Sequence, residues 1–160
     1  MAKLILLCLA ASVGCCWALG SRAAANPGLE VTIVAERLIA SEADQSIAFA
    51  PAANMRLGEQ IYYTLRVRNV SEQPIANAII EHPIPRNTRY VGAAQGPAAS
   101  ISVSVDGGKN YGELRQLVMS TSPGATRRAA AEDCTHLRFR LRYPLLPGAT
   151  ALLRFRAEFR

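Results

Sequence analysis

Cys134 and His136 are the residues of this chain best suited to chemistry, because they lie only two positions apart. Alternate residues of a β-strand share a face, so on a strand both side chains would lie opposite Leu137 and Phe139. A thiolate beside an imidazole is a candidate nucleophile pair, or half of a soft-metal site that His82 would extend. The alternative, which we favour, is that both are exposed residues at a strand end.

Two acidic motifs are weaker candidates. Asp106-Gly107-Gly108 offers one carboxylate to a calcium ion but lacks the further acidic residues of a calcium loop, so it is interpreted as a hairpin turn. Glu132 and Asp133 resemble a glycosidase carboxylate pair only in type, since adjacent strand residues point to opposite faces. No phosphate-binding glycine loop and no serine-triad motif occurs. We therefore predict no catalytic residue, no metal site, no cofactor and no enzymatic activity.

The elements that would position these residues are short alternating strands. From Ile61 to Arg68 apolar and polar residues alternate without a break, which is typical of a half-buried strand. Turn residues separate further runs of this kind, which predict strands at 29–35, 75–80, 89–93, 100–105, 114–119, 135–143 and 153–160. The segments 51–58 and 121–133 are predicted to be loops, and the last two strands to pair as a hairpin across Pro144–Gly148. This pattern predicts an all-β, immunoglobulin-like antiparallel sandwich.

The alternation also predicts which side chains enter the core. The inward set is Tyr63, Leu65, Val67, Leu137, Phe139 and Phe155. Arginines occupy the opposite face of the last two strands, and because like charges destabilise neighbouring strands, we expect Glu158 or another acidic strand nearby. These arginine faces are either anion-binding or partner-docking surfaces or, as we favour, solvated outer faces protected from aggregation by charge.

The first 25 residues are interpreted as a signal peptide. Lys3 precedes an apolar run that ends near the small residues Ala23 to Ala25. A retained membrane anchor and lipid attachment at Cys15 are the alternatives. Cleavage leaves one domain, residues 26–160, in which Cys134 is the single cysteine and no internal disulfide can form.

The number and placement of charged residues argue against a nucleic-acid partner. The chain has 18 Lys and Arg against 12 Asp and Glu, a net charge of +6, and loss of residues 1–25 removes two of the basic residues. Nucleic-acid binding needs a clustered basic patch with interleaved aromatic residues, and the arginines here alternate along strands instead. We predict no nucleic-acid partner.

Several spaced motifs resemble a known family. Gly58-Glu59-Gln60-Ile61-Tyr62-Tyr63-Thr64, Val67-Arg68-Asn69, Ala76-Asn77 and Pro83-Ile84-Pro85 are similar to the bacterial conserved-repeat surface domain called domain of unknown function 11. Val105 to Gly108, Thr135 to Phe139 and Pro147 to Ala149 extend the resemblance over residues 29–160. Glu81-His82, Phe139 and Cys134 depart from the family pattern. The resemblance implies an immunoglobulin-like sandwich outside the cytoplasm and no catalytic residues.

These observations lead to two function classes. We expect an exported, non-catalytic structural or interaction module of the bacterial cell envelope, periplasmic or at the cell surface, without a membrane span in its mature form. It would dock another envelope or surface protein through a sheet face or a sheet edge. The alternative is a small periplasmic accessory protein that binds a ligand or a metal ion through Cys134 and His136.

Overall fold

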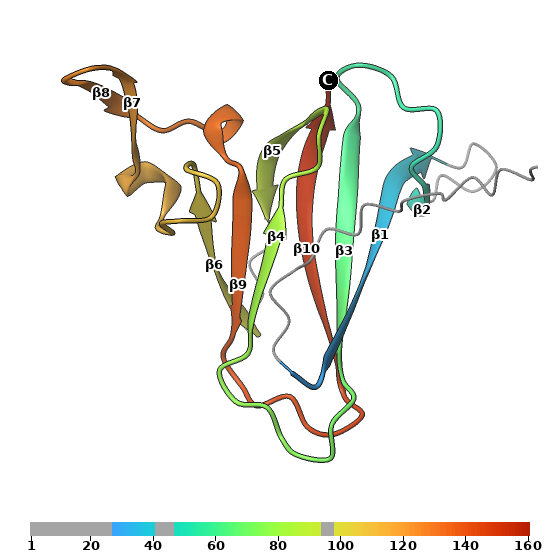
Figure 1. Ribbon diagram of the computed structural model, residues 1–160. Coiled ribbons are helices and arrows are strands. Elements are labelled where there is room, and N and C mark those ends of the chain that lie inside the picture. Colours follow the sequence, from blue (N-terminus) through green and yellow to red (C-terminus); the bar gives the residue numbers. More distant parts are fainter. Residues whose placement is uncertain (1–26, 41–46, 94–97) are drawn as a thin grey trace, which may run out of the picture.

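The computed structural model describes residues 27–40, 47–93 and 98–160, and within these ranges the regular elements are β-strands and two short 3-10 turns (Figure 1). The predicted signal peptide lies outside the described residues. In the described part of the chain, no helix has the length and apolar character needed to cross a membrane.

Two antiparallel sheets form the body of the molecule. The larger sheet contains, in spatial order, β2 (Ile47–Pro51), β1 (Leu29–Ala40), β3 (Gln60–Asn69), β10 (Thr150–Phe159) and β5 (Thr88–Ala93). The smaller sheet contains β4 (Ile79–Pro83), β9 (His136–Leu141) and β6 (Ala99–Ser104). A hairpin of β7 (Val118–Ser122) and β8 (Ala125–Arg128) projects from one end (Figure 1). The all-β antiparallel sandwich predicted from the sequence is confirmed.

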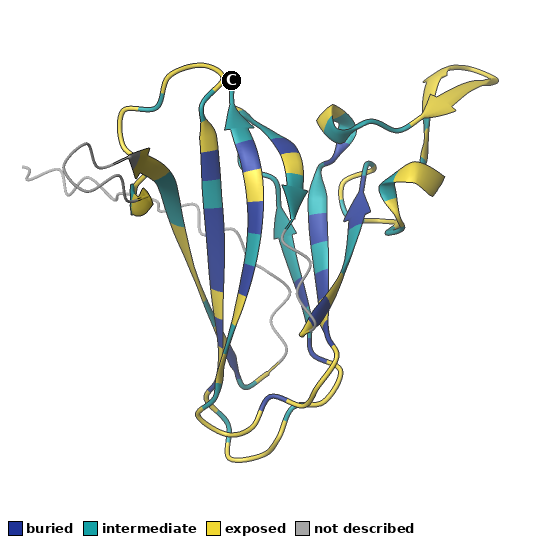
Figure 2. Cartoon of the chain, turned by 180° about the vertical axis from the view of Figure 1, so that it is seen from behind, coloured by how far each residue is buried: buried dark blue, intermediate teal, exposed yellow. Residues whose placement is uncertain are grey.

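The core lies between the two sheets and has the predicted composition. Leu65, Val67, Leu137 and Phe155 are completely buried, and Phe139 is 1% exposed. The ring of Tyr63 stacks on that of Phe155 at 4.9 Å between centroids. Burying a side chain of this size stabilises a fold by about 1.5–3 kcal/mol, so this set accounts for much of the cohesion between the sheets (Figure 2).

The predicted hairpin of the last two strands is wrong. β9 lies between β4 and β6 in the smaller sheet, whereas β10 lies between β3 and β5 in the larger one. Both strands carry an apolar face, and those faces meet across the core instead of lying side by side. The segment 144–148 therefore crosses between sheets, and Leu145 within it pairs with Ile75.

The predictions for residues 114–133 are wrong in large part. A 3-10 turn at Leu114–Gln116 replaces the first part of the strand expected at 114–119, and Val118 begins a hairpin that continues to Arg128. A second 3-10 turn, Ala131–Asp133, follows where a loop was expected. Pro123 and Gly124 lie at the tip, where Gly124 has a φ of +82°, so these two residues make a turn within a hairpin.

The bounds of several strands differ from the sequence prediction. The strand expected from Ile75 begins only at Ile79, because Asn77 has a φ of +52° that breaks extended backbone. β1 continues past Ala35 to Ala40, and β2 forms from residues in which no strand was expected.

Candidate functional site

Cys134 is not the exposed residue that was expected. It follows the 3-10 turn Ala131–Asp133, its side chain is 7% exposed, and its thiol contacts the carbonyl oxygen of Ala130 at 3.9 Å. Burial, reinforced by the nearby Asp133 and Glu132 carboxylates, raises the pKa of the Cys134 thiol to about 11. A thiol with this pKa is protonated at neutral pH and is a poor nucleophile and a poor metal ligand.

The two histidines do not extend a site around Cys134. His136 is paired with Pro83 and Ser104, whereas His82 is paired with the core residue Leu137, so the imidazoles lie on opposite faces of the smaller sheet. The ring of His82 lies 5.8 Å from that of Phe155, and burial lowers the pKa of His82. Among the described residues, no group of three or more His, Cys, Asp or Glu side chains is placed to hold a metal ion.

The Asp106 carboxylate is already occupied by donors of its own loop. One oxygen accepts hydrogen bonds from the Ser104 hydroxyl at 2.7 Å, the Asn110 amide N–H at 2.9 Å and the Lys109 N–H at 3.1 Å. The other accepts one from Nδ2 of Asn110 at 2.7 Å. These bonds hold the pKa of Asp106 well below its usual range. The carboxylate therefore organises the turn, as the sequence indicated.

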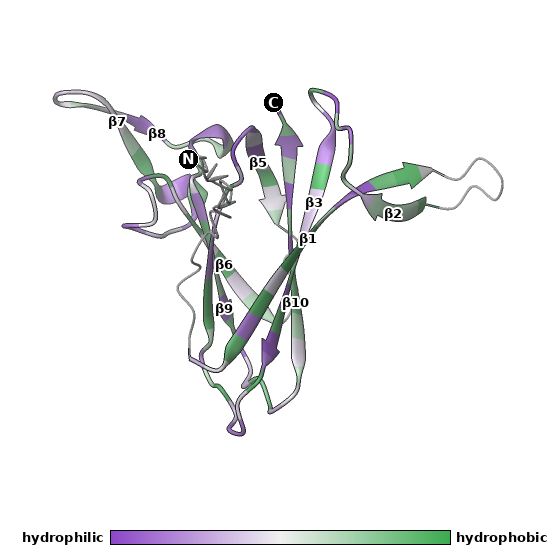
Figure 3. Cartoon of the chain, turned by 45° about the vertical axis from the view of Figure 1, so that its right-hand side comes forward, coloured by the Kyte–Doolittle hydropathy of each residue, from purple (hydrophilic) through white to green (hydrophobic). Residues whose placement is uncertain are grey.

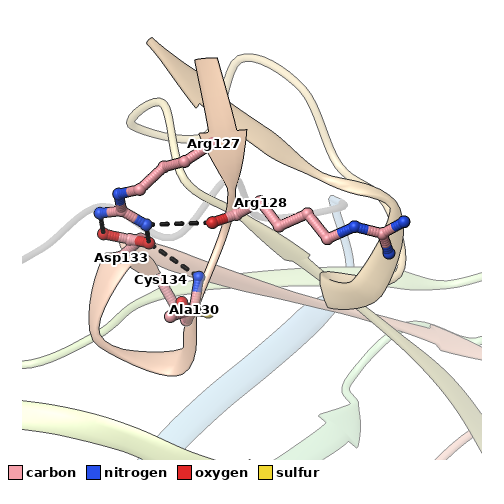
Figure 4. Close-up of polar contacts among 5 residues, drawn as sticks. All are labelled: Arg127, Arg128, Ala130, Asp133 and Cys134. Atoms are coloured by element: carbon pink, nitrogen blue, oxygen red, sulfur yellow. Dashed lines mark hydrogen bonds and ion pairs between the residues drawn. The ribbon is translucent and has the colours of Figure 1, made fainter. Parts of the chain in front are cut away.

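Asp133 has a similar structural role at the base of the β7–β8 hairpin (Figure 4). Its two oxygens accept a fork of hydrogen bonds from Arg127 at 2.6 and 2.7 Å, and one also accepts the Ala130 N–H at 2.7 Å. These donors lower the pKa of Asp133 to about 2. A carboxylate ionised and fully paired in this way is not available as a general acid.

The arginine faces are partly neutralised by acidic residues on other strands of the same sheets. Arg138 on β9 pairs with Glu81 on β4, and the Arg89 side chain on β5 pairs with Glu158 on β10. Arg154 on β10 is 3.9 Å from Glu36 on β1 and also donates to Thr64. The expectation that acidic strands accompany the arginines is thus confirmed, and this favours solvated outer faces.

A hollow of about 720 Å³ lies between the edge strands of the two sheets. Its walls are β5, β6 and the segment 112–115, and Arg115 within it pairs with Glu113. Val103 of β6 exchanges two backbone hydrogen bonds with Gly112, so part of the β6 edge is covered. No catalytic set of side chains converges in this hollow among the described residues.

The feature that sequence reasoning missed is the β1–β2 arm, which we define as residues 33–40 and 47–51. The larger sheet has five strands and the smaller three, and the arm extends away from the packed body (Figure 3). Its large apolar side chains are therefore between 40% and 72% exposed: Ile33, Val34, Leu38, Ile39, Ile47 and Phe49. Large apolar side chains that stay exposed together on one element are typical of an interaction site.

β2 forms the outer edge of this arm and has no charged residue. Its sequence is Ile-Ala-Phe-Ala-Pro, whereas the edge strand β4 contains Glu81 and His82 and the edge strand β5 contains Arg89. Sheet proteins use charged residues on edge strands to block pairing with other chains. The alternation of Ile47, Phe49 and Pro51 with two alanines was the sequence signal for this strand.

A scan against models of protein families found none that matches this chain, and no curated protein matched it. The resemblance to the conserved-repeat surface domain is therefore still a prediction.

Proposed function

We propose that this protein is an exported, non-catalytic interaction module of the cell envelope that docks a protein partner by strand addition at the free edge of β2. The observation that carries the proposal is the combination of an uncharged edge strand with exposed apolar side chains on both faces of the β1–β2 arm. In strand addition, main-chain hydrogen bonds supply affinity and alternate side chains supply specificity.

The direction of the peptide groups supports this docking mode. The Ala52 N–H donates to the Ala35 carbonyl at 3.0 Å, in the same register as the β1–β2 pairs. Because hydrogen-bonding direction alternates along an antiparallel strand, Ala48 and Ala50 direct their N–H and C=O groups toward β1. Ile47 and Phe49 direct theirs away from the sheet, where a partner strand can bind them.

The metal-binding alternative is weaker. It requires a reactive thiol at Cys134, whose side chain is 7% exposed and whose pKa is raised to about 11 by burial. It also requires ligands on one side of a strand, whereas His82 and His136 lie on opposite faces of the smaller sheet.

Site-specific photo-crosslinking in the native host tests the proposal. A photoreactive amino acid at position 49 should give a discrete crosslinked species. The matched control is position 66, because Arg66 is exposed on the same outer face but lies on the central strand β3, where it is paired with Thr32 on one side and Leu152 on the other. Absence of a crosslink at position 49, or equal crosslinking from both positions, would argue against docking at β2.

A further inference from the structure

We infer that the partner strand at the β2 edge is β2 of a second copy of this chain, joined in a two-fold symmetric, antiparallel pair centred on Phe49. The inference rests on the proposed function, since it names the occupant of the same edge. It is carried by the hydrogen-bonding groups of that edge, by its lack of charge and by the arrangement of its side chains.

The outward backbone groups of β2, which pair with no other strand in the described part of the chain, are complementary to themselves. The outward N–H groups belong to Ile47 and Phe49, and outward carbonyls belong to these residues and to Pro51. The Pro51 carbonyl already accepts the Ala53 N–H at 2.8 Å and has a second lone pair for a further donor. When all five residues pair with all five of a second copy, Phe49 lies opposite the same residue and exchanges two hydrogen bonds with it. In each copy, the Ile47 N–H then donates to the Pro51 carbonyl of the other copy. Every outward N–H of the strand is satisfied, although proline has none to donate.

Charge favours this edge for contact between identical chains. The chain is basic, with a net charge of +6, or +4 without residues 1–25 (16 basic minus 12 acidic residues), so two copies repel each other least where the contact surface itself is neutral. β2 is neutral along its whole length, whereas β4 and β5 would bring identical charged side chains close to a two-fold axis. The edge of β6, the other uncharged edge strand, is partly covered by Gly112.

The side chains around the two-fold axis also fit a second copy. Phe49 is 42% exposed and Ile47 is 72% exposed, and both lie on the outer face. Phe49 is already oriented by Tyr62, whose ring lies 5.3 Å away edge-on, and by the Arg154 guanidinium 4.4 Å above the ring. On the inner face, Ala48 and Ala50 would pair without steric conflict. Paired aromatic residues on neighbouring strands stabilise a sheet.

The first test measures the mass of the purified protein in solution by sedimentation velocity. The protein concentration is varied from about 1 µM to about 1 mM, a range that covers the dissociation constants of weak and moderate dimers. We expect a reversible monomer–dimer equilibrium. Phe49→Pro removes the central N–H donor, which points away from β1, and should weaken dimerisation about tenfold or more beyond the effect of Phe49→Ala. Circular dichroism and a thermal melt check that each variant is folded.

A charge exchange tests the symmetry. Phe49→Arg and Phe49→Glu each place like charges opposite one another and should each weaken the dimer, whereas an equimolar mixture should restore association by about fivefold or more relative to either variant alone. Leu152→Arg and Leu152→Glu are matched controls on the same sheet and should have no such effect. Monomer at every concentration, or a dimer that is insensitive to position 49, would overturn the inference.

The two proposals fail differently. If the protein is monomeric but position 49 crosslinks to a different chain in the host, the second copy is wrong and docking at β2 stands. If position 49 gives neither self-association nor a crosslink, both proposals are wrong.

Discussion

The Nδ2 group of Asn69 donates a hydrogen bond to the carbonyl oxygen of Leu145 at 2.8 Å, across 76 residues of chain. Asn69 ends β3, and Leu145 lies in the segment that connects the two sheets after β9. The same amide also donates to the Gln73 carbonyl at 2.8 Å, and Oδ1 accepts from the Ser71 N–H at 2.9 Å. The Asn69 backbone adds bonds to Gly148 and Ala149. One buried side chain thus joins two connections at the same end of the sandwich.

We expect Asn69→Ala to lower the free energy of unfolding by about 2–3 kcal/mol, because it leaves buried carbonyl and N–H groups without partners. Urea unfolding at neutral pH measures this. Ser71→Ala is the matched control, since its hydroxyl bonds are partly exposed, and should cost about 1 kcal/mol or less. Equal losses would mean that the turn as a whole, and not the Asn69 amide, links the connections.

The register of β3 can be tested with two neighbouring residues. Leu65 is completely buried, whereas Arg66 is exposed on the outer face. Leu65→Ala should cost about 2–5 kcal/mol and Arg66→Ala about 0.5 kcal/mol or less. Chemical denaturation of both variants gives the comparison. A register shifted by one residue would exchange the faces and reverse the order of the two losses.

Which side chains enter the core could be predicted from the sequence, but the pairing of strands could not. A period of two along 61–68 assigns each residue to a face without naming a neighbour. β9 and β10 carry the same alternation, and a connection as short as 144–148 suits a hairpin as well as a crossing between sheets. The pairing depends on where Leu145 and Ile75 meet, which is a long-range contact.

The candidate sites, too, could be predicted from the sequence only in part. The turn role of Asp106 could be predicted, because glycines at 107 and 108 are a local signal. The burial of Cys134 could not, since it depends on the 3-10 turn before β9. The β2 edge was missed because its five residues follow a segment with no clear period, and because exposure of an apolar strand depends on the width of the opposite sheet.

His82 should make the stability of the fold depend on pH. Burial, with a smaller contribution from His136, lowers the pKa of its imidazole below the ordinary value of 6.5. In the unfolded chain the ring takes up a proton near that value, so below it the unfolded state binds more protons than the folded state. The free energy of unfolding should therefore fall as the pH drops from about 7 to about 5. Urea unfolding across this range measures the slope.

The control for that slope is His82→Gln, which is polar and does not titrate. This variant should lose most of the pH dependence between the same limits. A slope that remains unchanged would assign it to other groups.

Cys134 should be unreactive in the folded protein. With the thiol pKa raised to about 11, almost none is thiolate at about pH 8, and the side chain is 7% exposed. Iodoacetamide should therefore label the native protein far more slowly than the urea-unfolded chain, as followed by mass spectrometry. Labelling of the native protein at the unfolded rate, or stoichiometric zinc lost on Cys134→Ser, would revive the binding-protein alternative.

Asp133 should order the β7–β8 hairpin, whose residues are otherwise largely exposed. Its carboxylate is 9% exposed and pairs with Arg127, which is 47% exposed, so the pair adds about 1 kcal/mol or less to global stability. The local effect should be larger, because the same carboxylate also binds the Ala130 N–H where the hairpin joins the body. Asp133→Asn should increase the backbone mobility of residues 118–128, measured by ¹⁵N relaxation, with little change in the melting temperature.

The order of the β7–β8 hairpin should also depend on pH, here through the Asp133 carboxylate and not through an imidazole. Hydrogen bonds from Arg127 and Ala130 lower the pKa of Asp133 to about 2, below the ordinary 3.8. The ordering is therefore present above the ordinary value and is lost as the pH falls through about 2. Arg127→Ala should reproduce the mobility of Asp133→Asn at neutral pH. Arg128→Ala is the matched control, because Arg128 donates only to the exposed Arg115 carbonyl at 3.2 Å. If the hairpin becomes mobile in Arg128→Ala but stays ordered in Asp133→Asn, the Asp133–Arg127 pair does not order it.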